Sequence, residues 1–138
     1  MFQGKHSDIT EMIIGAFFDT YNKLGFGFAE KVYEKALAIE LRKRGLEVQI
    51  QRPIQVYYEG EVVGQYYADL LVNDAVIVEL KSARQILEEY EAQLLNYLKA
   101  TTYEVGLVLN FGPKPQHSRR VYDNQRKGLL NWLQPENS

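Results

Sequence analysis

Apolar residues in the first third of the chain recur at helical spacing. Between residues 8 and 24 they stand three or four positions apart, which predicts one helix. The glycine-punctuated stretch "GFGF" follows, and the same spacing then continues over residues 29–44 until Gly45, a residue type that commonly ends helices. We therefore expect two helices joined by a short turn.

The middle of the chain changes to short apolar segments separated by turn residues. Residues 47–58 and 62–72 flank the turn "EGE", and residues 76–81 ("VIVELK") follow the turn "NDA". Segments of this length, rich in β-branched and aromatic residues, predict strands. The simplest arrangement is an antiparallel meander of three strands.

Helical spacing returns over residues 84–100, and a continuous apolar run over residues 104–111 ends at "GPKP". Such a run fits a strand buried on both faces, and the helix before it predicts a crossover that makes this strand parallel to one strand of the meander. Residues 121–133 predict a final helix. We expect one α/β domain over residues 1–138, a mixed sheet flanked by helices in the order α-α-β-β-β-α-β plus a C-terminal helix.

Composition narrows the classes of site. The 138 residues are 46% hydrophobic and 25% charged, which is ordinary for one globular domain. The chain has no cysteine and only two histidines, His6 and His117, so disulfides, zinc-thiolate sites and multi-histidine metal sites are excluded, and any metal must bind oxygen ligands. Without an apolar stretch long enough for a membrane span or a signal peptide, we expect a cytoplasmic protein with no membrane partner.

Charge is unevenly distributed along the chain. The net charge of −2 argues against a pure nucleic-acid coat protein. Residues 111–128, however, carry five basic residues against one acid, and Lys114, Arg119 and Arg120 are among them. This segment predicts a basic patch on an acidic body, with these three residues as phosphate contacts.

Three charged residues interrupt the apolar strands. In "YYADLLVNDAVIVELKSA", Asp69, Glu79 and Lys81 stand among Tyr, Val, Leu and Ile. Burying an unpaired charge costs roughly several kcal/mol. These side chains must therefore pair, be hydrated or bind a ligand.

The position of Asp69 depends on the length of the hairpin loop. Glu79 and Lys81 are two residues apart on one strand and share a face. A two-residue loop at residues 73–74 would put Asp69 on the opposite face, whereas a three-residue loop at residues 73–75 would pair position 69 with position 79. Only the second register forms one site, in which two carboxylates with Cβ atoms roughly 5 Å apart can bind one hard cation.

Two carboxylates, a lysine and a divalent cation fit the hydrolysis of a phosphodiester. Mg²⁺ or Mn²⁺ held by Asp69 and Glu79 would activate water and neutralise phosphate charge, and Lys81 would orient the nucleophile or stabilise the transition state. The competing interpretation is a plain ion pair between Lys81 and one of the carboxylates. For "VELK" by itself, the ion pair is the commoner case.

A longer set of motifs resembles the PD-(D/E)XK nuclease superfamily, and within it the small GxxExxY branch. The motifs run in order from residue 9 to residue 112: Gly27, Glu30 and Tyr33 in "GFAEKVY", then "ALAIELRKRG", "IQRPIQVYY", "ADLLV", "VIVELK", "AQLLNYLKA" and "VGLVLNFG".

This resemblance implies a restriction-endonuclease-like core and a Mg²⁺- or Mn²⁺-dependent nuclease whose substrate is nucleic acid, with DNA favoured over RNA. Asp69, Glu79 and Lys81 would be the D, E and K of the signature, and Ala68 stands in place of its proline, which supplies no ligand. A chain this short has little beyond a catalytic core, so sequence-specific recognition would need a partner or a homodimer.

The resemblance also adds helical residues to the site. Glu30 would be a further metal ligand or water contact, and Gln93 with Tyr97 would match a "QxxxY" element, whose two side chains share one helix face. The alternatives are a solvated helix face for Glu30 and a core aromatic with a hydrogen-bonded hydroxyl for Tyr97. Tyr90 stands where relatives often carry histidine, which puts the role of that histidine in doubt here.

The second hypothesis is a non-catalytic module that keeps the nuclease fold and binds nucleic acid or another protein. The acidic balance of the chain favours it, and metal titration distinguishes the two hypotheses.

Overall fold

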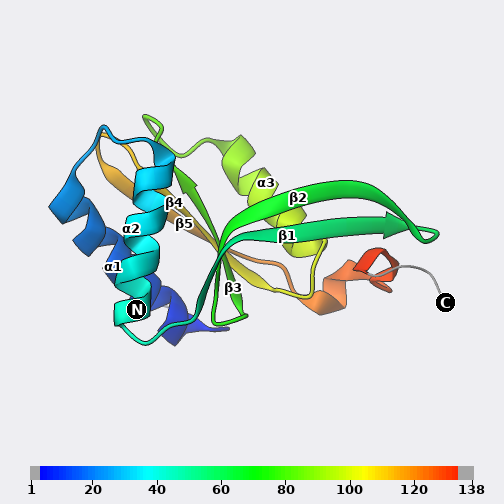
Figure 1. The fold of residues 1–138 in the computed structure, drawn as a ribbon. Coiled ribbons are helices and arrows are strands. Elements are labelled where there is room, and N and C mark those ends of the chain that lie inside the picture. Colours follow the sequence, from blue (N-terminus) through cyan, green and yellow to red (C-terminus); the bar gives the residue numbers. More distant parts are fainter. Residues whose placement is uncertain (1–3, 134–138) are drawn as a thin grey trace.

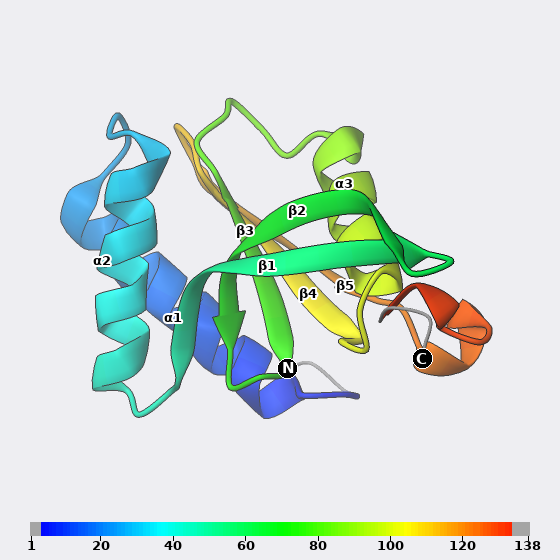
Figure 2. The ribbon, with the colours of Figure 1, turned by 45° about the vertical axis from the view of Figure 1, so that its right-hand side comes forward.

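A five-stranded mixed sheet forms the centre of the protein in a computed structural model that describes residues 4–133 (Figure 1). Helices α1 and α2 cover one face of the sheet, and α3 covers the other (Figure 2). The elements are α1 (Ser7–Leu24), α2 (Glu30–Lys43), β1 (Val48–Tyr58), β2 (Glu61–Val72), β3 (Val76–Lys81), α3 (Glu88–Lys99), β4 (Val105–Phe111) and β5 (Pro115–Val121). None of the helices in this described part is long and apolar enough to cross a membrane.

The strands lie in the order β1-β2-β3-β4-β5. Neighbours are antiparallel except β3 and β4, which are parallel and are connected through α3. This crossover confirms the predicted mixed sheet. Every residue of β4 is buried, and so is every residue of β3 before Lys81, as expected for central strands covered on both faces.

The core between the sheet and α1–α2 is organised around aromatic rings. Tyr33 of α2 stacks on Phe111 of β4 with ring centroids 4.2 Å apart, and Phe17 of α1 meets the same ring edge-on at 4.8 Å. All three side chains are fully buried. Aromatic pairs of this kind contribute about 0.5–1.5 kcal/mol beyond the area they bury, and here they fix α2 against the centre of the sheet.

The end of the chain differs from the prediction. Residues 115–121 form a fifth strand that the sequence did not predict, because an edge strand with one partner needs no apolar alternation and "PQHSRRV" has none. The predicted final helix is wrong: two short 3₁₀ turns, η1 (Asn124–Lys127) and η2 (Asn131–Leu133), take its place. Gly128 and Leu130 between them have positive φ angles of 77° and 57°, which interrupt a helix.

The β1–β2 hairpin extends past the rest of the sheet as an arm (Figures 1 and 2). Val48 packs with the core on the α1–α2 side, whereas Ile54 packs with the core on the α3 side. Alternate residues of a regular strand share a face, so β1 changes faces between these positions. Leu70 and Ala68 show the same change on β2. The change on β1 spans Gln51, whose φ of 56° is left-handed.

The segment after β3 is anchored to β4. Asn110 is fully buried, and its amide both accepts a hydrogen bond from Ala83 N at 2.8 Å and donates one to Ala83 O at 3.0 Å. Gly112 approaches the same backbone so closely that an added Cβ would lie 2.1 Å from the Ala83 oxygen. Both contacts fix the chain just beyond Lys81.

Replacing Gly112 by Ala should therefore destabilise the protein by about 1–3 kcal/mol, because backbone must move to admit the methyl group. Urea unfolding followed by circular dichroism measures this. Gly15→Ala, in the middle of α1, is the control: its new Cβ would lie 3.7 Å from Arg44 Nη1, an ordinary contact, and it should stabilise by about 0.5–1 kcal/mol. Equal stabilities of the two variants would contradict the close approach.

Candidate functional site

The loop between β2 and β3 decides where Asp69 lies. Pairing runs from Val72↔Val76 to Leu70↔Val78, so the loop has three residues. Continued by one step, this register sets Asp69 opposite Glu79. The structure therefore selects the register that forms one site.

The two acids lie where β2 diverges from β3. Beyond Leu70 the strands share no further paired residues, and side chains take over the bonds between them: Asp69 N donates to Glu79 Oε2 at 2.8 Å, and Leu80 N donates to Asp69 Oδ2 at 2.7 Å. Glu79 is 3% exposed and Asp69 is partly buried. Each carboxylate is thus held in place by the backbone of the neighbouring strand.

A third acid, which the sequence analysis missed, joins them from α2. Glu34 is 4% exposed. Gln51 Nε2 donates to Glu34 Oε2 at 2.8 Å and to Asp69 Oδ1 at 3.2 Å, and so links the two acids. The available signal was that Glu34 shares the apolar helix face of Leu37 and Leu41, where a carboxylate is unusual.

The three helical residues predicted for the site differ in their exposure to solvent. Glu30, the first residue of α2, is exposed, and so is Gln93 on α3. Tyr97 is 6% exposed and packs in the core on the α3 side, where burial first and then the charges of Glu79 and Asp69 raise the pKa of its hydroxyl. The structure therefore brings Tyr97 to the acids and leaves the side chains of Glu30 and Gln93 in contact with solvent.

Lys81 lies beside the acids at the end of β3. Its Nζ stands 4.8 Å from the centre of the Tyr90 ring, at a cation–π distance. Burial raises the pKa of both Asp69 and Glu79, and the positive charge of Lys81 opposes this rise. Tyr90, the position of the expected histidine, thus serves as a support for the lysine.

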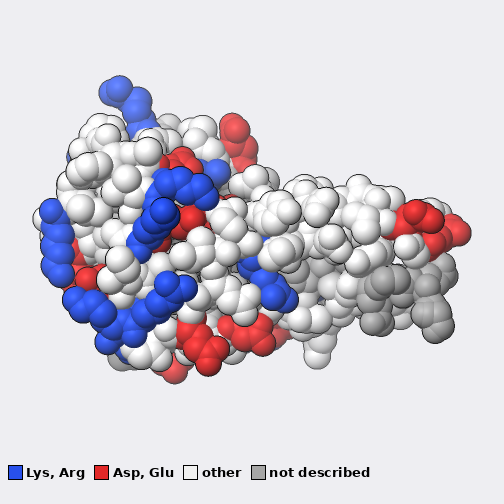
Figure 3. Space-filling view, viewed as in Figure 1, with Lys and Arg blue, Asp and Glu red and all other residues white. Residues whose placement is uncertain are grey.

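Two of the three residues of the predicted basic patch interact with other parts of the protein. Arg120 on β5 forms an ion pair with Glu91 of α3 at 2.6 Å, Arg119 donates to the Lys5 carbonyl oxygen, and Lys114 is exposed. Figure 3 shows further lysine and arginine side chains on the side of the molecule that carries α1 and α2, while the arm is largely uncharged up to its acidic tip. Exposed basic residues of α2 are Lys31, Lys35, Arg42 and Lys43.

Both strand carboxyl groups have raised pKa values. Burial raises the pKa of Glu79 from 4.5 to about 8, and repulsion from the Asp69 carboxylate adds to this, against the hydrogen bond from Asp69 N. Burial also raises the pKa of Asp69, against the hydrogen bond from Leu80 N. Within the described residues neither acid forms a salt bridge. Full ionisation of both carboxyl groups is therefore unfavourable unless a cation compensates for their charge.

A hard divalent cation fits this donor set. Asp69 and Glu79 offer carboxylate oxygens and excess negative charge, which Mg²⁺ and Mn²⁺ prefer. In residues 4–133, however, no group of three or more His, Asp or Glu side chains is already arranged as a metal cluster. Among the described residues, the side chain of Gln51 is the hydrogen-bonded link between Glu34 and the strand pair.

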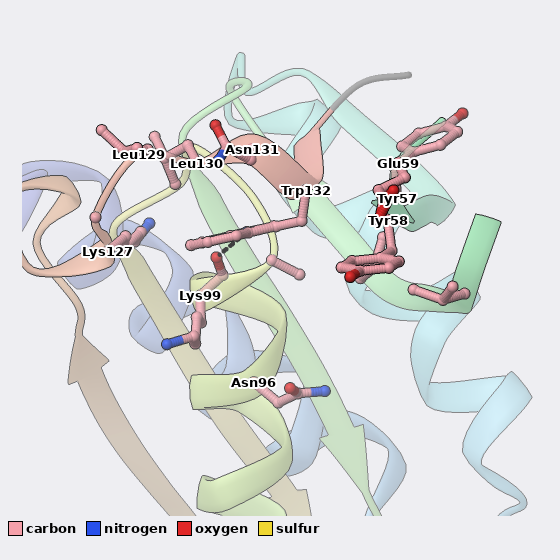
Figure 4. A pocket seen from close by; sticks show the side chains of 14 residues that line it. Tyr57, Tyr58, Glu59, Asn96, Lys99, Lys127, Leu129, Leu130, Asn131 and Trp132 are labelled. Carbon is pink, nitrogen blue, oxygen red and sulfur yellow. Dashed lines mark hydrogen bonds between the residues drawn. The ribbon is translucent and has the colours of Figure 1, made fainter. Parts of the chain in front are cut away.

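A pocket of about 960 Å³ lies elsewhere, between the arm, the end of α3 and the 3₁₀ turns (Figure 4). Tyr57, Tyr58 and Trp132 line it, and Trp132 Nε1 donates to Lys99 O at 2.9 Å. None of the three site acids borders it. This pocket is therefore separate from the acid cluster.

The raised pKa of Glu79 predicts that the metal-free protein loses stability as pH increases. Between pH 4.5 and about 8 the folded state binds more protons than the unfolded state, so the free energy of unfolding falls across this window. Asp69 acts in the same direction. Glu79→Gln should flatten this dependence and exceed wild type by about 1–3 kcal/mol at the upper end, measured by urea unfolding in EDTA.

Glu59→Gln, at the exposed tip of the arm, is the matched control for loss of one charge. Burial lowers the pKa of Lys127 to about 8. Its contribution to the pH dependence of stability therefore falls above the window from pH 4.5 to about 8 and does not obscure the effect of Glu79. A wild-type stability that rises over the window would contradict the burial of a carboxylate here.

Two solved structures share this fold. The chain is similar to the crystal structure of SSO0001, with a TM-score of 0.54 and 18% identity, covering 90% of this chain and 62% of that chain. It is also similar to an alkaline exonuclease (LHK-Exo) from Laribacter hongkongensis, with a TM-score of 0.52 and 13% identity, covering 93% of this chain and 76% of that chain. At such identities the likeness shows the fold. No curated protein matches the chain.

The sequence comparison identifies a family, which the similarity of fold does not. A family model described as the PD-(D/E)XK nuclease superfamily matches residues 7–121. This range holds both strand acids, Lys81, and the helices that cover them. The acid pair at the divergence of two strands and the lysine two residues after Glu79 agree with that match: the chain belongs to the PD-(D/E)XK nuclease superfamily.

Proposed function

We propose that the protein is a Mg²⁺- or Mn²⁺-dependent nuclease that hydrolyses phosphodiester bonds of nucleic acid, with DNA favoured. The observation that carries the proposal is the pair of carboxylates, Asp69 and Glu79, fixed by backbone N–H groups with Lys81 beside them. Membership of the nuclease superfamily supports it.

Asp69 and Glu79 would hold the metal ion, and Glu34 is the acid placed to join them. Glu30 was assigned this role from the resemblance, but its side chain is exposed one turn earlier on α2. A bound divalent ion supplies Lewis-acid activation of water and neutralises phosphate charge. The protein contributes the fixed orientation of the carboxylates, because both accept hydrogen bonds from strand backbone.

Lys81 and Tyr97 complete the proposed chemistry. The Lys81 ammonium, supported by the Tyr90 ring, is placed to stabilise the negative charge that grows on phosphate oxygens in the transition state. Burial raises the pKa of Tyr97 to about 12, so its hydroxyl stays protonated and can donate a hydrogen bond. Gln93, exposed on the same helix, stays a prediction for substrate contact.

Nucleic acid would be held by basic side chains outside the acid cluster. Lys114, Arg119 and Arg120 stay the predicted phosphate contacts, although Arg120 would have to exchange its ion pair with Glu91 for a phosphate. A homodimer, which would supply a second basic surface, also stays a prediction. Binding through such contacts weakens as salt increases.

The non-catalytic binding module is the second candidate, and an assay with purified protein decides between them. Lys81→Ala should keep Mn²⁺ binding, because lysine is not a ligand, and should lower turnover roughly a hundredfold or more. Asp69→Asn should lose both Mn²⁺ binding and cleavage. Calorimetry measures the first property, and cleavage of single-stranded DNA, duplex DNA and RNA with Mg²⁺, Mn²⁺ or EDTA measures the second.

Lys35→Ala, an exposed lysine of α2, is the control for loss of a charge. Folded wild-type protein that neither binds Mn²⁺ nor cleaves any substrate above the Asp69→Asn background would remove the nuclease proposal and leave the binding module.

Glu34 and Glu30 offer a direct comparison on one helix. Glu34→Gln should lower Mn²⁺ affinity and turnover about 10–100-fold, as loss of a ligand or its support does, because Glu34 is buried beside Asp69. Glu30→Gln should stay within about twofold of wild type, since the charge of an exposed side chain is screened by solvent. The reverse ranking would restore Glu30 as the helical ligand.

A further inference from the structure

Gln51 occupies an unusual place among the acids. Its amide nitrogen lies 2.8 Å from Glu34 Oε2 and 3.2 Å from Asp69 Oδ1. A carboxamide nitrogen carries two N–H groups, and each carboxylate accepts one. A neutral group with partial positive charge thus stands between two acids that would otherwise face each other.

The backbone is bent to place this side chain. Gln51 has a φ of 56°, in the left-handed region that few residues other than glycine adopt. The flanking pairs Ile50↔Leu70 and Arg52↔Ala68 keep one register, so the bend does not shift the pairing of the strands. Its effect lies in the direction of the side chain, which reaches Glu34 on α2.

The other oxygens of these acids have partners of their own. Asp69 Oδ2 accepts from Leu80 N, and Glu34 Oε1 accepts from Lys31 Nζ at 3.4 Å. The amide nitrogen of Gln51 lies within hydrogen-bond distance of both Asp69 Oδ1 and Glu34 Oε2. A cation held by both acids through these two oxygens would take the place of this nitrogen.

We propose that Gln51 is a latch that replaces the cation in the metal-free protein and is released when a divalent metal binds. This inference rests on the proposed metal-dependent function and adds a positioning residue to it. Because the latch stabilises only the metal-free state, its bonds must be broken before metal can bridge the acids. Gln51 thereby sets the metal concentration at which the site fills.

Gln51→Met tests the latch, because methionine has a similar length and no N–H donor. The metal-free variant should unfold at a lower temperature than wild type in EDTA, and the two proteins should unfold at equal temperatures in saturating Mn²⁺. By linkage, Mn²⁺ should bind the variant about tenfold more tightly, the change expected from losing hydrogen bonds to charged groups. Scanning fluorimetry and calorimetry give these quantities without any nuclease assay.

Gln51→Lys tests the same idea from the opposite direction. An ammonium group held at this place is a permanent cation, so Mn²⁺ should bind at least about tenfold more weakly than to wild type. The metal-free variant should be more stable than Gln51→Met. Gln55→Met is the control, since Gln55 is an exposed glutamine of the same strand whose amide oxygen accepts from Tyr57.

The affinity of Gln51→Met decides the proposal. Tighter Mn²⁺ binding with lower metal-free stability supports the latch, and no merely structural role would tighten metal binding. Binding equal to or weaker than that of wild type would overturn it and assign Gln51 to the metal-bound state. Wild-type protein that binds no Mn²⁺ would contradict the proposed function itself, which separates the two failures.

Discussion

Strands β2 and β3 pair from Val72↔Val76 to Leu70↔Val78 and then diverge, and this divergence shapes the surroundings of both acids. Where two strands part, backbone N–H groups lose their partners, and buried donors without acceptors are costly. Here Glu79 accepts a hydrogen bond from Asp69 N, and Asp69 accepts one from Leu80 N. The two carboxylates thus satisfy N–H groups at the point where the β1–β2 arm diverges from the sheet.

Placing carboxylates at this point destabilises the metal-free protein, because Glu79 is buried, Asp69 is partly buried, their charges repel each other, and Glu34 lies near them. The compensation is found around the site. Central strands buried on both faces, the Tyr33–Phe111 stack and the Asn110 contacts with Ala83 hold the surrounding backbone in place. A rigid frame can keep charges together that would separate in a softer one, and such stored repulsion favours a cation ligand.

The sequence predicted the parts of this protein that repeat or that must be buried. Two N-terminal helices, the central strands and the parallel crossover follow from apolar spacing, and the odd-numbered loop explained how Asp69 could meet Glu79. Strand β5 was not predicted, because it pairs with one neighbour only and its sequence has no apolar pattern. Glu34 and Gln51 escaped because their roles depend on a left-handed backbone angle and on how α2 lies over β1, which local sequence does not specify.

The residues Gly27, Glu30 and Tyr33 acquire a different meaning in three dimensions. The Tyr33 hydroxyl donates to Gly25 O and accepts from Phe28 N, so it ties down the "GFGF" turn just before α2 begins, and Gly27 has a φ of 121° that suits glycine. Together with the Phe111 stack, these contacts fix both the start of α2 and its rotation about its axis. Glu34 directly follows Tyr33 in the sequence, so the rotation of α2 about its axis directs the Glu34 side chain toward Gln51. The motif is therefore best understood as the support that brings a buried helical acid to the strand pair.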